Sequence, residues 1–158
     1  MERKSCCFTG HRSLEAEKIP LIKDKLREIL TECIENGYTD FYNGGALGFD
    51  MLSAELVIEM KESYPQLKLH IIVPCEGQSR PWSKDNVTRY ERILSLSDEV
   101  KCLSPHYFNG CMQIRNRYMV NNSSLCISYV CDTKGGSAGT VRYARNQGKE
   151  IINIAEAL

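Results

Sequence analysis

Two glycine-rich segments carry the clearest chemical signal in this chain. Residues 43–50 read NGGALGFD and residues 135–140 read GGSAGT, so G-G-x-x-G precedes or opens a predicted helix twice. Glycine lets a ligand approach the main chain closely, and a helix start offers unpaired N–H groups and the positive end of a dipole. The pattern predicts phosphate-binding loops that use Gly44, Gly45, Gly48, Gly135, Gly136, Ser137, Gly139 and Thr140.

A third loop, TGHR, follows the first predicted strand and adds Thr9, Gly10, His11 and Arg12 as ligand-binding candidates. One helix terminus favours an anion by only about 0.3–1 kcal/mol, so useful affinity needs several converging loops. Tight turns that serve only helix–strand packing are the simpler reading of any single loop. Three such loops favour an anion site, although no G-x-G-x-x-G fingerprint is present and a standard NAD-dependent dehydrogenase is disfavoured.

Two arginines, Arg115 and Arg117, stand beside the most apolar stretch of the chain. Residues two apart do not share a helix face. In a helix that starts near Cys111 or Met112, one arginine would face the strand ends while the other forms a salt bridge or lies in solvent. Burying both without partners would cost several kcal/mol per ion. Two alternatives stay open: an exposed pair without function, or ligand-binding arginines.

Three further side chains have competing readings. Asp50, just before an apolar helix, is expected to be an N-cap worth about 1 kcal/mol, with ligand contact second. Trp82 follows the loop EGQSRP, where it either stacks on a base or seals the loop against the next helix. Glu76 either binds a ribose hydroxyl or is simply solvated, and the solvated state is the simpler one.

The composition excludes several classes of protein. The 158 residues suit one domain over 1–158, and 20 basic residues balance 20 acidic ones, so nothing attracts the whole chain to nucleic acid or anionic lipid. Eight cysteines without a C-x-x-C pair and three scattered histidines predict reduced, buried thiols and no metal site. No apolar run of about 18 residues occurs, so we expect a cytoplasmic protein without signal peptide or membrane contact.

Short apolar runs alternate with helical patterns along the chain. The runs predict strands at 5–8, 39–42, 67–73, 99–103, 123–130 and 150–154. Helices are expected from Pro20 to about residue 35, from about Asp50, from Ser83, from residue 111 or 112, and over 137–146. This alternation predicts an α/β, Rossmann-like, doubly wound and mostly parallel sheet of about six strands with helices on both faces. Such sheets bind ligands past the carboxyl ends of their strands.

Several segments resemble known families. The stretch from RNRYMV to NQGKEI is similar to the R-N-R, apolar strand, turn and helix of the DNA-processing protein DprA (Smf). NGGALGFDMLSAELVI resembles that family's S-G-x-A-x-G-x-D-x-x-A-H segment, with Glu55 in the place of the histidine. GGSAGT resembles the P-G-G-x-G-T loop of LOG-type phosphoribohydrolases. Both families belong to the SLOG superfamily of Rossmann-like domains.

The resemblance is most extensive for the YpsA-like branch of that superfamily. CFTGHR, EGQSRPW, GCMQIRNRYMV and GGSAGT are similar to its segments, in its order, over nearly the whole chain. The resemblance implies a nucleotide or a nucleotide derivative, such as an ADP-ribose- or NAD-like molecule, as ligand at the strand ends. The resemblance gives a site more readily than an activity. We expect a sensor or regulatory module rather than an enzyme, with no certain cofactor; a homo-oligomer is left open.

Two other functions remain alternatives. A phosphoribohydrolase would cleave an N-glycosidic bond with a carboxylate near the ribose, but Tyr143 stands where the LOG pattern has its glutamate. The catalytic residues are therefore unknown, and Glu55, Asp50 or Glu76 would serve only if the fold brings one to the sugar. Single-stranded DNA binding, as in DprA, would need a basic groove. The balanced charge weakens that reading without excluding it.

Overall fold

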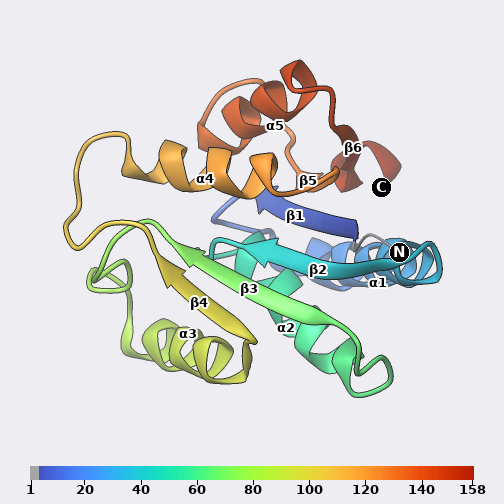
Figure 1. The fold of residues 1–158 in the computed structure, drawn as a ribbon, viewed down its shortest axis with the longest axis horizontal. Coiled ribbons are helices and arrows are strands. Elements are labelled where there is room, and N and C mark those ends of the chain that lie inside the picture. The colour runs from blue at the N-terminus through green and yellow to red at the C-terminus, as the bar shows by residue number, and fades with distance from the viewer. Residues whose placement is uncertain (1–3) are drawn as a thin grey trace.

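The chain folds around a single six-stranded sheet in the computed structural model, which describes residues 4–158. The strand order is β4-β3-β2-β1-β5-β6, and every neighbouring pair is parallel. The predicted α/β doubly wound sheet is confirmed, and it is wholly rather than mostly parallel (Figure 1). The strands are β1 (Lys4–Gly10), β2 (Tyr38–Asn43), β3 (Lys68–Val73), β4 (Glu99–Cys102), β5 (Leu125–Tyr129) and β6 (Glu150–Asn153).

Five α-helices cover the two faces of the sheet. The helices α1, α2 and α3 pack on one face, and α4 and α5 pack on the other (Figure 1). Because the chain moves outward from β1 to β4 and then returns to β5, the strand order reverses between β1 and β5. The bounds are α1 (Ile19–Glu35), α2 (Phe49–Lys61), α3 (Lys84–Leu96), α4 (Cys111–Asn121) and α5 (Gly136–Asn146), with short 3-10 turns at Ala16–Lys18 and Ile154–Ala157.

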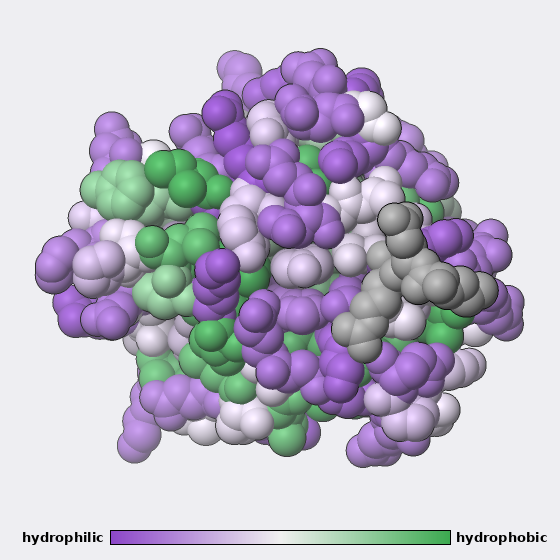
Figure 2. Space-filling model, in the orientation of Figure 1, coloured by the Kyte–Doolittle hydropathy of each residue, from purple (hydrophilic) through white to green (hydrophobic). Residues whose placement is uncertain are grey.

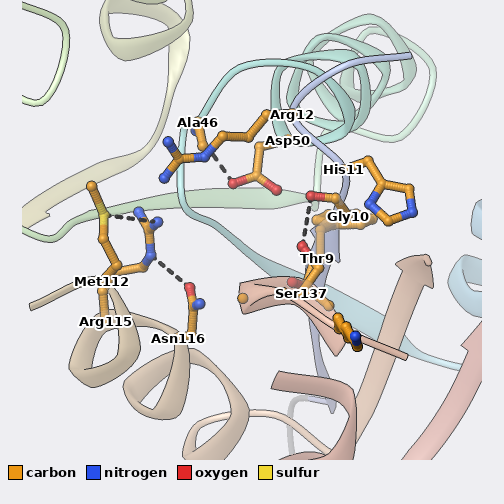
Figure 3. A pocket seen from close by; sticks show the side chains of 14 residues that line it. Thr9, Gly10, His11, Arg12, Ala46, Asp50, Met112, Arg115, Asn116 and Ser137 are labelled. Carbon is orange, nitrogen blue, oxygen red and sulfur yellow. Dashed lines mark hydrogen bonds between the residues drawn. The ribbon is translucent and has the colours of Figure 1, made fainter. Parts of the chain in front are cut away.

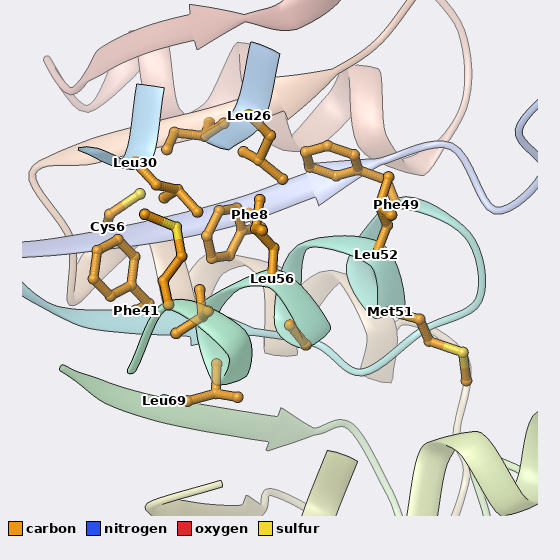
Figure 4. Packing of buried hydrophobic residues seen from close by; sticks show 14 of the residues in the cluster. Cys6, Phe8, Leu26, Leu30, Phe41, Phe49, Met51, Leu52, Leu56 and Leu69 are labelled. Carbon is orange, nitrogen blue, oxygen red and sulfur yellow. The ribbon is translucent and has the colours of Figure 1, made fainter. Parts of the chain in front are cut away.

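The larger hydrophobic core lies between the sheet and α1 and α2 (Figure 4). Phe8 on β1 stacks on Phe41 of β2 with ring centroids 6.0 Å apart, and it meets Phe49 of α2 edge-on at 6.4 Å. Phe49 is the first residue of α2, so this contact anchors the start of that helix beside the end of β1. A smaller core under α4 and α5 contains Cys7, Ile72, Met119, Val120, Cys126 and Ala144.

Most predicted elements lie within two residues of the observed ones. Ser83 is the N-cap of α3, as predicted, and its hydroxyl accepts from Asn86 N at 3.3 Å. The N-cap prediction for Asp50 is wrong: α2 begins at Phe49 after Gly48, whose φ of 79° suits glycine. The carboxylate instead accepts from Ala46 N at 3.2 Å, which leaves it inside the loop rather than on the helix cap.

The cysteines are all free, and six of the eight are buried. Cys102 was expected to be a buried strand residue, but it lies exposed on β4, because that strand is at the edge of the sheet. Within residues 4–158, none of the helices is both long and apolar enough to cross a membrane.

Candidate functional site

A cavity of about 310 Å³ opens at the carboxyl end of β1, next to the point where the strand order reverses. This is the place at which doubly wound sheets bind ligands. Its walls come from the loops after β1 and β2, from α4 and from the start of α5 (Figure 3). The lining residues are Phe8, Thr9, Gly10, His11, Arg12, Ala46, Asp50, Met112, Arg115, Asn116, Lys134, Gly135, Gly136 and Ser137.

The loop after β1 is held tightly against the start of α2. Phe49 N donates to His11 O at 3.0 Å, which links the two segments directly. A Cβ at Gly10 would lie 2.5 Å from the Phe49 ring, and one at Gly48 would lie 2.4 Å from His11 O. Gly10 is therefore required by the close approach of the Phe49 side chain and Gly48 by that of the β1 loop main chain, independent of any ligand.

His11 and Ser137 join the β1 loop to the start of α5. His11 Nε2 accepts from Cys131 N at 2.8 Å, and because this nitrogen accepts, the ring carries its proton on Nδ1. Ser137 Oγ donates to Gly10 O at 2.7 Å. These two contacts fix the distance between two of the predicted ligand loops. The position of α5 over the cavity therefore depends on Gly10, the last residue of β1, and on His11 directly after it.

Arg115 reaches from α4 into the sheet and is 3% exposed. Its Nη1 donates to Gly44 O at 2.7 Å and to Ile72 O at 3.1 Å, and its Nε donates to Asn116 Oδ1 at 2.8 Å. A Cβ at Gly44 would lie 2.6 Å from Nη1, so this glycine makes room for the guanidinium. Burial lowers the pKa of Arg115, and the nearby Asp50 acts in the opposite direction.

Asp50 is the one carboxylate in the described lining, and it is 7% exposed. Burial raises its pKa from 3.8 to about 6, while Arg115, the Ala46 amide and Arg12 limit the rise. Figure 3 shows Arg12 and Asp50 on one side of the cavity and Arg115 on the other. The cavity thus presents three cationic side chains, from Arg12, Arg115 and Lys134, around a carboxylate that is easily protonated.

A second cavity of about 240 Å³ lies between α4 and α5, on the other side of the α5 start. Arg117, predicted to bind the same ligand as Arg115, lines this second cavity instead, with its guanidinium 4.9 Å from the Tyr143 ring centroid. Arg142 also lines it and donates to Thr133 O at 2.7 Å. The remaining lining residues are Gln113, Asn116, Gly135, Gly136, Gly139 and Thr140.

The other predicted site residues lie outside both cavities. Trp82 packs edge-on against Tyr90 with centroids 5.1 Å apart, as in the packing alternative. Glu76 is exposed on its loop, and Glu55 forms an ion pair with Arg89. Of the three weak catalytic candidates, Asp50 alone lines the first cavity. Gly44, Gly45 and Gly48 shape the loop behind the cavity wall without lining it.

The sequence reasoning missed several supporting residues. Asn43 is fully buried, donates to Asp50 O at 2.9 Å and accepts from Gly45 N at 2.8 Å, so it fixes the β2–α2 loop. Gln78 is also buried and donates to Gly44 O at 3.3 Å. Asn43 directly precedes the quoted glycine pair, which is a signal for an Asx-type turn. No group of three or more metal-ligating side chains within residues 4–158 is placed to hold a metal ion.

Comparison with known proteins gives the family. The YpsA profile, described as "YspA SLOG family", matches residues 6–154. The chain belongs to this SLOG family. UPF0398 proteins of Bacillus thuringiensis (strain Al Hakam) and Bacillus cereus (strain AH187) are each 31% identical to it over 137 residues, which cover 85% of this chain and 74% of the relative.

Solved structures with the same fold include two DNA processing proteins A. The Helicobacter pylori protein superposes with a TM-score of 0.66 at 22% identity, and the Streptococcus pneumoniae protein with 0.67 at 15%. Each match covers 94% of this SLOG chain, which spans 63% and 49% of those two longer proteins. At these identities the two likenesses show a shared fold.

Proposed function

We propose that this SLOG protein binds a nucleotide or a nucleotide derivative in the first cavity, as a sensor or regulatory module. The observation that carries the proposal is the convergence of three loops and a helix start on one cavity at the strand-order reversal. Binding sites for small molecules typically have volumes of about 300–1,000 Å³. The first cavity, at about 310 Å³, lies at the lower end of that range. The charge of its lining selects for an anion.

The phosphoryl group is assigned to the start of α5. Gly135 has a φ of 100°, which suits glycine, and Cβ atoms built at Gly135 and Gly136 meet nothing within 4 Å. The space above these main-chain atoms is thus open on the protein side, as an approaching phosphate requires. Arg12 and Lys134 are exposed and supply positive charge to the lining of the cavity. Arg115 contributes chiefly through the electrostatic attraction of its positive charge for the anion, because its Nη1 already donates to the Gly44 and Ile72 carbonyls.

A hydrolase is the second candidate, and Asp50 is the observation that favours it. N-glycosidic cleavage needs a carboxylate beside the ribose, and Asp50 is placed inside the cavity with a raised pKa. The protein from H. pylori has a described single-stranded DNA binding mode, which makes DNA the third candidate. The balanced total charge of this chain keeps DNA last.

The test compares the wild type with two matched valine variants of α5. Gly136 lines both cavities and Gly139 lines only the second. Both lie in the first turn of α5, so each change replaces a glycine of the same helix by valine. AMP, NAD, ADP-ribose and a short oligonucleotide serve as probes in thermal shift and calorimetry. We expect a nucleotide-type probe to stabilise the wild type and Gly139→Val, and Gly136→Val to lose the response while its unfolding free energy stays within about 1 kcal/mol.

Four results would contradict the proposal or redirect it. If none of the probes binds the wild type, or if Gly136→Val responds like the wild type, the site is misplaced. Release of a free base from a bound nucleotide, abolished by Asp50→Asn, would replace the sensor with the hydrolase. Binding of the oligonucleotide alone would replace it with DNA binding.

A further inference from the structure

Strand β4 forms an open edge of the sheet. It is the last strand in the order and pairs only with β3. All four of its residues, 99–102, are exposed. The strand therefore offers main-chain N–H and C=O groups along its outer side, which is the usual template for pairing with another strand.

Hydrophobic side chains gather around this edge. Among the described residues, seven large hydrophobic side chains are exposed, and four of them lie between residues 96 and 108. These are Leu96 at 44%, Val100 at 47%, Tyr107 at 68% and Phe108 at 43%. Figure 2 shows hydrophobic surface along the side of the molecule where Figure 1 places β4 and the loop after it. Such clustering marks an interaction surface rather than scattered exposure.

We propose that β4 pairs in antiparallel orientation with β4 of a second copy of this chain, so that two sheets become one. The two copies are related by a two-fold axis perpendicular to the sheet. Such an axis keeps each residue on its own face, and residues opposite one another point to the same face. The axis must therefore lie midway between the two strands at the level of one residue, which then faces its own copy. The charges of β4 decide which residue that is.

Only one centre within β4 brings opposite charges together. With the axis at Val100, Glu99 of each copy faces Lys101 of the other, and both pairs are attractive. An axis at Lys101 would place two lysines opposite each other, and an axis at Glu99 would place two glutamates opposite each other. An axis at Cys102 would pair no charges within the strand. The same side chains that block the neighbouring registers thus favour the one centred on Val100.

Contacts within one copy hold both charges in place over the sheet. Glu99 Oε1 lies 2.9 Å from His70 Nδ1, and the Glu99 side chain is still 49% exposed. Lys101 Nζ donates to the Tyr118 hydroxyl at 3.2 Å and lies 4.9 Å from that ring centroid. Both charges are therefore oriented but accessible. The proposal uses no part of the ligand cavity and stands apart from the proposed function.

The test uses charge reversal. Glu99→Lys gives a strand with two lysines, and Lys101→Glu gives a strand with two glutamates, so each variant should repel its own copy. We expect sedimentation equilibrium to show a wild-type dimer and self-association that is roughly tenfold to hundredfold weaker in each variant. An equal mixture of the two variants restores both opposite-charge pairs and should dimerise again, as should the double variant E99K/K101E.

The mixture shows whether a variant fails to dimerise because its charges repel in this register or because its fold is damaged. Circular dichroism of each variant checks that it is folded, and loss of folding in one variant would still leave the double variant as a test. A wild type that stays monomeric up to millimolar concentration overturns the proposal. So does a dimer that both single reversals leave intact, or a mixture and a double variant that stay monomeric.

Discussion

The two cavities beside the start of α5 share Asn116, Gly135 and Gly136, yet they are built in different ways. In the first, Arg115 and Asp50 are buried and bonded to main-chain atoms of the neighbouring loops. In the second, Arg117 and Arg142 are exposed and contact only a ring and one carbonyl. Arg115 and Arg117, which are only two residues apart in the sequence, thus line different cavities.

The contrast concerns how far the lining side chains of each cavity also hold the fold together. The buried charged groups of the first cavity are also bonded to its loops, so changing them should alter the stability of the fold as well as the proposed ligand binding. The second can lose a side chain at little cost to the fold. Variants in the two cavities should therefore differ most in their unfolding free energies.

Replacing Arg115 should have the largest effect. Arg115→Met removes donors to Gly44 O, Ile72 O and Gln78 Oε1, and it leaves Asp50 without its nearest buried cation. Breaking a buried charged network by removing one partner typically costs about 3–5 kcal/mol. We expect a loss of this order in the unfolding free energy at neutral pH, measured by urea denaturation.

A double variant serves as the control for that result. Asp50→Asn in the Arg115→Met background removes the uncompensated carboxylate and should recover part of the loss, so that the two changes are not additive. Strict additivity, or a loss below about 1 kcal/mol in the single variant, would show that the first cavity is no more tightly built than the second.

The pH dependence of stability should show the raised pKa of Asp50. Its pKa is 3.8 in the ordinary state and about 6 in the fold, so the folded state holds the proton more tightly. Proton binding by Asp50 therefore contributes stability that is fully present below pH 3.8 and is lost as the pH rises through about 6. The shift corresponds to a free energy on the order of 3 kcal/mol.

The measurement is the unfolding free energy of the wild type minus that of Asp50→Asn, followed across pH 3 to 8 (about 4 to 6 being the informative range). The difference should fall through that range and level off above it. Asp24→Asn, at an exposed site on α1, is the matched control for removing a carboxylate outside the cavity, and its difference serves as the baseline. A difference that rises with pH would mean that Arg115 and Arg12 outweigh burial.

The fold was predictable from the sequence because its strands and helices follow local patterns. Alternating apolar runs, Pro20 at the start of α1 and Ser83 before α3 each specify an element by short-range physics. The loops after β1 and β2 were also correctly placed at the strand ends, since parallel strands bring their carboxyl ends to one edge of the sheet.

The details of the site depended on long-range contacts that no local pattern contains. Whether Arg115 or Arg117 turns inward is decided by carbonyls of Gly44 and Ile72, which lie 71 and 43 residues away in the sequence. The prediction that Asp50 is an N-cap was wrong for a similar reason. The helix begins one residue earlier, at Phe49, whose ring packs against Phe8 of β1. Residue types indicated the chemistry, but packing determined the geometry.

The smallest effect is expected for Arg117→Ala. An exposed cation–π contact is worth about 0.5–1 kcal/mol, so the unfolding free energy should fall by no more than that. Tyr143→Leu removes the same contact and also the hydrogen bond that the Tyr143 hydroxyl donates to Asn121 Oδ1 at 2.7 Å, so its loss should be larger. The double variant should lose little more than Tyr143→Leu alone, because the contact with Arg117 is then already absent. If a bound nucleotide extends past Gly135 into the second cavity, Arg117→Ala will weaken binding of a diphosphate-containing probe such as ADP-ribose while leaving AMP unchanged in calorimetry. Equal weakening of both probes would instead show that the two cavities act on the same phosphoryl group.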